Sequence, residues 1–270
     1  MPETNTPDAT PDGAKPDDTT DVLVEDVGWP DAAGGERVTA WVVRPRDPGA
    51  TPGPGILFWH WFDTEAPDGN RDEFLPEARE LAARGVVSLL PQGRFPWSID
   101  PSGSGADAAE VGREVARLRQ GLELLAGRPD VDASRLAVVG HDFGAMLAVL
   151  AAAEDPRVTA LALIAPTPRW ADWFLPFWQI DEDRIAYLAS MRPLDPVEVI
   201  GRVAPRPMLL QFGRRDFFIP LMAGLELRRA AGGEEAAELH AYDAEHDLHD
   251  AGARADRTAF LERALRLPSR

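Results

Sequence analysis

The chain of 270 residues has no cysteine and only one lysine, Lys15. Without cysteine it cannot form disulfides, thiolate metal sites or a cysteine nucleophile. Lys15 lies in an N-terminal stretch rich in Pro, Thr and Asp. Because this is the only lysine, Schiff-base chemistry and a phosphate-binding GxxxxGK loop are excluded. Any chemistry must therefore be carried by carboxylates, histidines, hydroxyls or the aromatic side chains.

Positive charge and long apolar runs are also scarce. There are 28 Lys and Arg against 45 Asp and Glu, a net charge of −17, which disfavours binding to nucleic acid or anionic membranes. No apolar run approaches the roughly 18 residues of a spanning helix. The N-terminus lacks the basic and apolar regions of a secretory signal. We expect a cytoplasmic protein acting on a small-molecule substrate, with no nucleic acid or membrane partner; composition leaves the oligomeric state open.

The hydrophobic pattern predicts one α/β domain over residues 22–270, preceded by a disordered acidic tail over residues 1–21. Strands and helices alternate, which indicates a mostly parallel sheet with helices on both faces. The predicted strands are 22–27, 37–43, 55–61, 85–90, 135–140, 158–166, 207–213 and 238–243. The predicted helices are 71–84, 106–127, 145–153, 221–231 and 251–266.

The stretch VVGHDFGAM (138–146) is typical of a catalytic turn between a strand and a helix. Glycines at 140 and 144 let the strand and the helix approach closely, and the central residue is lifted above the sheet. Where the G-x-S-x-G pattern has serine, this chain has Asp142. The negative charge of Asp142 would be stabilised by the helix N-terminus. A turn-forming aspartate in a non-catalytic protein is the alternative.

Two further residues follow later strands in the order expected of a triad. Asp216 follows the strand at 207–213, and His246 follows the strand at 238–243. The order nucleophile, acid, histidine is that of α/β-hydrolases. His240 and His249 are alternatives to His246, which we favour because it lies in the loop directly after the last strand. The cluster HAYDAEHDLHD lacks the HExxH pattern, so we predict neither a metal nor a cofactor.

The chain resembles the α/β-hydrolase superfamily from about residue 22 to 268. The resemblance is carried by HWF (60–62), GHDFG (140–144), FGRRD (212–216) and AEHDL (244–248). Its overall spacing is similar to the dienelactone hydrolase and acetylxylan esterase branch. The GHD elbow is similar to epoxide hydrolases and haloalkane dehalogenases, whose nucleophile is Asp. The resemblance implies an α/β-hydrolase fold and an oxyanion hole formed by the backbone N–H groups of Trp61 and Phe143.

An aspartate at the elbow suits a particular chemistry. It is already ionised at neutral pH and can attack an sp3 carbon, opening an epoxide or expelling a halide to form an alkyl ester on the enzyme. His246, oriented by Asp216, would then activate water against that ester. Attack by Asp142 on an ester substrate would give an anhydride, which is poorly matched to an alkoxide leaving group. Asp142 and His246 could instead act as bases on water.

Residues 167–206 form a short insertion rich in aromatic residues, which we interpret as a lid over Asp142 or as a helix covering the core. The candidate substrate-pocket residues are His60, Trp97, Trp170, Trp173, Trp178 and Tyr187. Epoxide hydrolases use lid tyrosines to protonate the leaving oxygen, and Tyr187 is the candidate. Dehalogenases use indole N–H groups to hold the halide; because Phe143 has none, Trp61, Trp170, Trp173 or Trp178 would replace it.

These observations favour hydrolysis of a small neutral or apolar molecule through an alkyl-enzyme ester, with an epoxide preferred over an alkyl halide. Two alternatives remain. One is an esterase or lactonase of the dienelactone hydrolase type that uses water activated by Asp142 and His246. The other is a catalytically silent protein that keeps the aromatic pocket and binds small molecules.

Overall fold

The computed structural model describes residues 21–32, 34, 37–62, 70–94, 102–177 and 183–267, and within this set no side chain is described for residues 174–177. Most of the predicted tail lies outside these ranges. An eight-stranded sheet has the order β1-β2-β4-β3-β5-β6-β7-β8. Only β1–β2 and β2–β4 are antiparallel; the neighbours from β4 to β8 are parallel. The predicted mostly parallel sheet is thereby confirmed.

All eight predicted strands are present. Their bounds are β1 Val22–Trp29, β2 Val38–Pro45, β3 Gly53–Trp59, β4 Val87–Pro91, β5 Val131–His141, β6 Val158–Ile164, β7 Met208–Gly213 and β8 Ala237–Tyr242. The central strands are continuous apolar runs because helices cover both faces of a parallel sheet. Strand β5 begins earlier than predicted because Val131 and Asp132 already pair with the start of β3, before an irregularity in the register.

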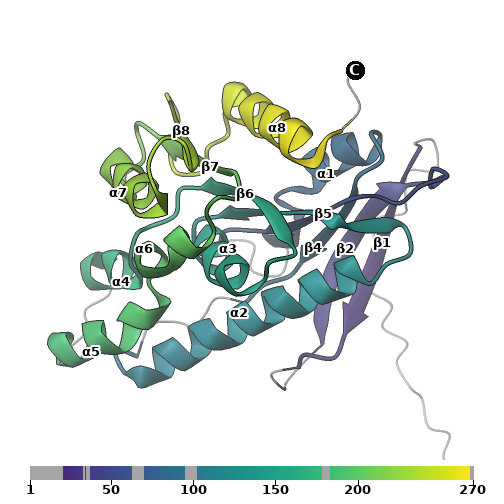
Figure 1. The fold of residues 1–270 in the computed structure, drawn as a ribbon. Coiled ribbons are helices and arrows are strands. Elements are labelled where there is room, and N and C mark those ends of the chain that lie inside the picture. The colour runs from purple at the N-terminus through teal and green to yellow at the C-terminus, as the bar shows by residue number, and fades with distance from the viewer. Residues whose placement is uncertain are drawn as a thin grey trace, which may run out of the picture.

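The predicted helices are also present, and the described part of residues 167–206 contains three further α-helices. Their bounds are α1 Leu75–Ala82, α2 Gly105–Ala126, α3 Phe143–Glu154, α4 Trp170–Phe177, α5 Arg184–Met191, α6 Pro196–Val199, α7 Leu221–Ala231 and α8 Ala251–Leu265. Helices α2 and α3 lie on one face of the sheet, and α1 and α8 lie on the other (Figure 1). Helices α4, α5 and α6 gather on the side away from β1 and β2 (Figure 1). No helix in the described ranges is long and apolar enough to span a bilayer.

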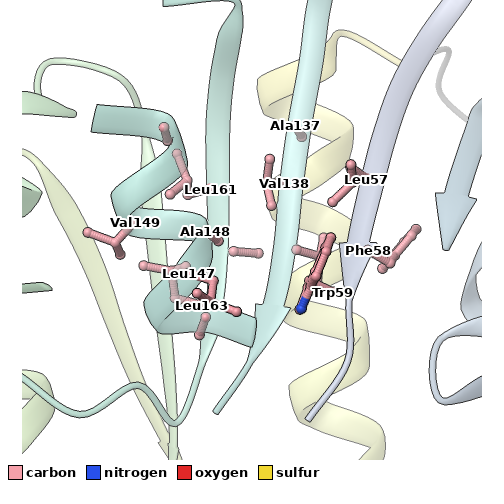
Figure 2. Packing of buried hydrophobic residues seen from close by; sticks show 14 of the residues in the cluster. Leu57, Phe58, Trp59, Ala137, Val138, Leu147, Ala148, Val149, Leu161 and Leu163 are labelled. Carbon is pink, nitrogen blue, oxygen red and sulfur yellow. The ribbon is translucent and has the colours of Figure 1, made fainter. Parts of the chain in front are cut away.

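Helix α3 packs on the central strands and forms part of the buried core. Side chains of β3, β5 and β6 meet those of α3 in one buried cluster (Figure 2). The labelled members are Leu57, Phe58, Trp59, Ala137, Val138, Leu147, Ala148, Val149, Leu161 and Leu163. Burying one such large side chain stabilises the fold by about 1.5–3 kcal/mol. This packing fixes the position of the N-terminus of α3, where Asp142 lies.

Candidate active site

The candidate site lies where the strand order reverses. Strands β3 and β5 are neighbours, but the chain passes from β3 to β4 on one side and then crosses to β5 on the other. Such a reversal leaves a crevice at the carboxyl ends of the strands, where α/β proteins bind ligands. Trp59 at the end of β3 pairs with Gly140 near the end of β5. The loop after β3 therefore lies next to the turn that carries Asp142.

Asp142 has a strained backbone conformation, with φ 52° and ψ −116°. Such a conformation costs about 1–3 kcal/mol in a residue other than glycine. The turn is held because the Asp142 N–H donates to the Ile164 carbonyl at 2.8 Å, and its carbonyl accepts from the amides of Ala145 and Met146, each at 3.0 Å. A side chain at Gly144 would collide with the carbonyl oxygens of Trp59 and His60. The turn therefore requires this glycine.

The structure brings together the three residues predicted for the triad. They lie in the turn after β5 and in the loops after β7 and β8. The Nδ1 atom of His246 is 2.9 Å from Oδ2 of Asp216. Its Nε2 atom is 3.8 Å from Oδ2 of Asp142, which is an ion-pair distance rather than a hydrogen bond. All three side chains are nearly fully buried.

The charge state of His246 follows from its two carboxylate neighbours. Burial alone would lower the pKa of His246, but Asp142 and Asp216 outweigh burial and raise it from 6.5 to about 10. The resting site therefore contains a protonated His246 between two carboxylates at neutral pH. Within the described part of the chain, Nε2 of His246 has no hydrogen-bond partner. The atom is also buried from solvent.

Asp216 is held rigidly in its loop. Its Oδ1 accepts hydrogen bonds from the backbone amides of Phe218 at 2.8 Å and Ile219 at 2.9 Å. Burial alone would raise the pKa of Asp216, but the hydrogen bond and charge of His246, together with these amides, hold it below its ordinary value. Asp216 is therefore a fixed carboxylate suited to orienting His246.

Helix α4, in the segment predicted to form a lid, makes one direct contact with Asp142. The indole N–H of Trp173, in α4, donates to Oδ1 of Asp142 at 2.7 Å, and Trp173 is 7% exposed. Its ring contacts those of Phe143, Phe218 and His246, with centroids 5.3, 5.5 and 5.8 Å apart. The two oxygens of Asp142 are thus distinguished, because Oδ1 faces Trp173 and Oδ2 faces His246.

The predicted oxyanion donor Trp61 is engaged elsewhere. Its backbone N–H donates to Oε2 of Glu73 at 2.9 Å, so in this structure the N–H is directed at that carboxylate. The prediction missed this contact because Glu73 belongs to the segment leading into α1. Phe143 opens α3 directly after Asp142. Phe143 remains a predicted donor.

His141 and Glu73 are site residues that the sequence analysis did not assign. Nδ1 of His141 lies 2.7 Å from Oε1 of Glu73, and Nε2 lies 3.0 Å from the backbone carbonyl of His246. A carbonyl can only accept, so Nε2 carries a proton. Through these contacts His141 and Glu73 link the loop after β3, which carries Trp61, to the turn at Asp142 and to the loop that carries His246. The only sequence signal was the position of His141 directly before Asp142.

Three residues predicted to line the pocket, His60, Trp170 and Tyr187, form hydrogen bonds with other parts of the fold. Nε2 of His60 accepts from the Gly93 amide at 2.8 Å, and burial lowers the pKa of His60, so it is a neutral residue that fixes its loop. The indole N–H of Trp170 donates to the Leu194 carbonyl at 2.8 Å, and Trp170 is fully buried.

Tyr187 is also placed differently from the prediction. Its hydroxyl donates to Oδ2 of Asp107, at the start of α2, at 3.0 Å. Burial and the charge of Asp107 raise the pKa of Tyr187. The other tyrosine of the chain, Tyr242, donates to Asp256 at 2.9 Å. Neither hydroxyl is directed at Asp142, so the predicted leaving-group acid is not supported by the geometry.

The remaining predictions concern residues or ligands that the structure does not test. Trp97 and Trp178 lie outside the described residues. Among the side chains that are described, no group of three or more His, Asp and Glu residues is arranged to hold a metal ion.

Comparison with known proteins shows the fold. No family model matches the sequence, and a search of curated proteins gives no match. Among solved structures, the chain is similar to an acetyl xylan esterase from Paenibacillus sp. R4, with TM-score 0.73, 19% identity, and coverage of 92% of this chain and 85% of that one.

Two further structures have the same fold. A protein assigned as a dienelactone hydrolase from Klebsiella pneumoniae has TM-score 0.62 and 19% identity, covering 91% of this chain and 98% of that one. A cold-adapted esterase from an Arctic intertidal metagenomic library has TM-score 0.64 and 16% identity, covering 93% and 98%. The predicted resemblance to the α/β-hydrolase fold is confirmed at the level of architecture.

Proposed function

We propose that the protein is a hydrolase in which Asp142 attacks an sp3 carbon of a small neutral or apolar substrate, with an epoxide preferred over an alkyl halide. The observation that carries this proposal is the pairing of a buried carboxylate on the strained elbow with a buried histidine, His246, 3.8 Å away. Unlike a serine hydroxyl, a carboxylate oxygen can attack without a base that first removes a proton from it. The histidine is therefore left for the other proton transfers.

The first half-reaction needs an attacking oxygen and a proton. Oδ2 of Asp142 forms a bond to one epoxide carbon, and the carbon–oxygen bond of the ring breaks. The alkoxide then takes the proton from Nε2 of His246, which is buried and has no other acceptor among the described residues. This assignment replaces Tyr187, whose hydroxyl is bound to Asp107. The products are a hydroxyalkyl ester on Asp142 and a neutral His246.

The second half-reaction uses the histidine as a base. Esterification removes the charge of Asp142, one of the two carboxylates that raise the pKa of His246. Neutral His246, still oriented by Asp216, takes a proton from water as the water oxygen bonds to Cγ of Asp142. Collapse of this intermediate breaks the bond from Cγ to the substrate-bearing oxygen, and His246 protonates the departing alkoxide.

The proton count favours an epoxide. Opening an epoxide consumes the proton of His246 and so creates the base that the second half-reaction needs. A halide leaves without a proton, so His246 would still be protonated when the ester forms and would have to release its proton to solvent first. The same site can process both classes, but only the epoxide reaction is self-contained.

Ester or lactone hydrolysis through activated water is the second candidate. It is favoured by the likeness in fold to structures described as esterases and as a dienelactone hydrolase. In this route His246 must be neutral in the free enzyme. The two carboxylates oppose that, since they raise its pKa to about 10. The route therefore predicts activity that climbs steeply with pH up to about 10.

The covalent route is tested with a His246→Gln variant. The glutamine amide can still donate a hydrogen bond to the epoxide oxygen, but the alkoxide must then take its proton from water, so an adduct should form slowly. Because glutamine cannot take the proton of water in the second half-reaction, the adduct should persist. After long exposure to separate panels of epoxides, alkyl halides and activated esters, the intact mass is measured and the modified peptide is mapped. An epoxide adds its whole mass, whereas an alkyl halide adds its mass less HX.

An adduct on Asp142 that is absent from the Asp142→Asn, His246→Gln double variant is the expected result. Absence of any adduct, together with ester turnover by the wild type, would support the water-mediated route instead. Absence of both would support a silent binding protein for these substrate classes.

A further inference from the structure

We infer that Trp173 is a catalytic residue whose indole N–H stabilises the oxyanion formed on Oδ1 of Asp142 during hydrolysis of the alkyl-enzyme ester. This inference rests on the proposed function and assigns one of its steps to the lid. The backbone donors that the sequence predicted for this role are Trp61 and Phe143. The structure adds a side-chain donor, which comes from α4.

The first step concerns which oxygen of Asp142 attacks. Oδ1 accepts the Trp173 N–H at 2.7 Å, whereas Oδ2 lies 3.8 Å from Nε2 of His246 and has no such short hydrogen bond to it. A donated hydrogen bond withdraws electron density from an oxygen and weakens it as a nucleophile. Oδ2 is therefore the attacking atom, and Oδ1 becomes the carbonyl oxygen of the ester.

The second step concerns where charge develops. When water adds to Cγ, the electron pair of the carbonyl bond moves to Oδ1, and the proton of the water goes to His246. The Trp173 N–H already lies at hydrogen-bond distance from Oδ1 before the reaction begins. A donor placed in advance in a buried site costs no reorganisation when the charge forms, which is the basis of oxyanion stabilisation.

The third step concerns the position of the Trp173 indole and the partner of the Trp61 amide. The ring of Trp173 contacts those of Phe143, Phe218 and His246, so the direction of its N–H is set by packing. The Trp61 amide, by contrast, donates to Glu73, and Glu73 is further bound to His141. Trp173 thus supplies the donor that the loop after β3 was expected to provide.

The test separates the two half-reactions in a Trp173→Phe variant. Phenylalanine keeps an aromatic ring against its neighbours but removes the N–H. Rapid quenching followed by intact-mass measurement gives the rate of adduct formation and the rate of adduct loss in one turnover of an epoxide. The matched control is Trp170→Phe, which also removes an indole N–H from α4. The N–H of Trp170 donates to the Leu194 carbonyl rather than to Asp142.

We expect adduct loss to slow by about 100-fold or more, the usual effect of removing one oxyanion donor. Adduct formation should be unchanged or faster, because the carboxylate loses a hydrogen bond that weakens it as a nucleophile. The adduct should therefore accumulate in Trp173→Phe and not in Trp170→Phe. A Trp173→His variant, which restores a ring N–H, should recover part of the rate of adduct loss and guards against a folding defect.

A parallel fall in both rates would overturn the inference, because it would mean that Trp173 only packs the lid. Unchanged adduct loss in Trp173→Phe would overturn it too, while leaving the covalent route intact. If the wild type forms no adduct at all in rapid quenching, the proposed function fails and the inference fails with it.

Discussion

Replacing Asp142 by asparagine removes one of the two negative charges beside His246 but keeps the size of the side chain. The variant reproduces the charge state of the alkyl-enzyme ester, in which Asp142 is neutral. In the wild type, burial lowers the pKa of His246, and Asp142 and Asp216 together raise it to about 10. Loss of one nearby opposite charge changes a pKa by about 1–3 units. The pKa of His246 should fall by that amount in Asp142→Asn.

The same change appears in the pH dependence of stability. Because the folded-state pKa of His246 lies above its ordinary value of 6.5, its protonation stabilises the fold fully below pH 6.5, and the stabilisation is lost as the pH rises through about 10. The shift corresponds to roughly 4–5 kcal/mol. Between pH 6.5 and 10, the free energy of unfolding of Asp142→Asn should therefore fall by about 1–4 kcal/mol less than that of the wild type.

Urea unfolding of both proteins between pH 6.5 and 10 measures this difference, and the ring resonances of His246, identified with His246→Gln, give the pKa directly. All other titrating groups are common to the two proteins, so the difference isolates the Asp142–His246 pair. Equal losses of stability in the two proteins, or an unchanged pKa, would refute the assignment of His246 as a charged partner of Asp142.

Two further predictions concern the orientation of His246 and the close approach at the elbow. Asp216→Asn should slow hydrolysis of the adduct by about 100-fold or more, because Nδ1 loses its carboxylate partner; rapid quenching measures this, and an unchanged rate would remove Asp216 from the triad. Gly144→Ala should lower the free energy of unfolding by about 1–3 kcal/mol, because its Cβ meets two carbonyl oxygens. Gly112→Ala, in an open position on α2, is the control and should be unchanged or about 0.5–1 kcal/mol more stable; equal urea midpoints for the two alanine variants would contradict the close approach.

The placement of Asp142, Asp216 and His246 in one site could be predicted because it depends on local sequence pattern and on chain order. A glycine-framed strand–turn–helix segment locates Asp142, and the carboxyl ends of parallel strands necessarily share one edge of the sheet. The loops carrying Asp216 and His246 follow two of those strands. Their convergence on Asp142 therefore needed no knowledge of individual contacts.

The hydrogen-bond partners of the residues around these three could not be predicted in the same way, because the partners come from distant segments of the chain. The Trp61 amide is taken by Glu73, which precedes α1. The hydroxyl of Tyr187 is taken by Asp107, which lies 80 residues earlier in the sequence. Residue type indicates that a group can donate a hydrogen bond, but only packing decides which acceptor it meets.

The measurement that tests the central claim most directly is a single turnover of an epoxide in water enriched in oxygen-18, with the wild-type enzyme in excess. If Asp142 is the nucleophile, the diol of the first turnover carries an oxygen from Asp142, so it contains no heavy oxygen, and the label appears in the Asp142 peptide. A labelled diol with an unlabelled Asp142 would mean that water attacks the substrate directly, and it would contradict the account.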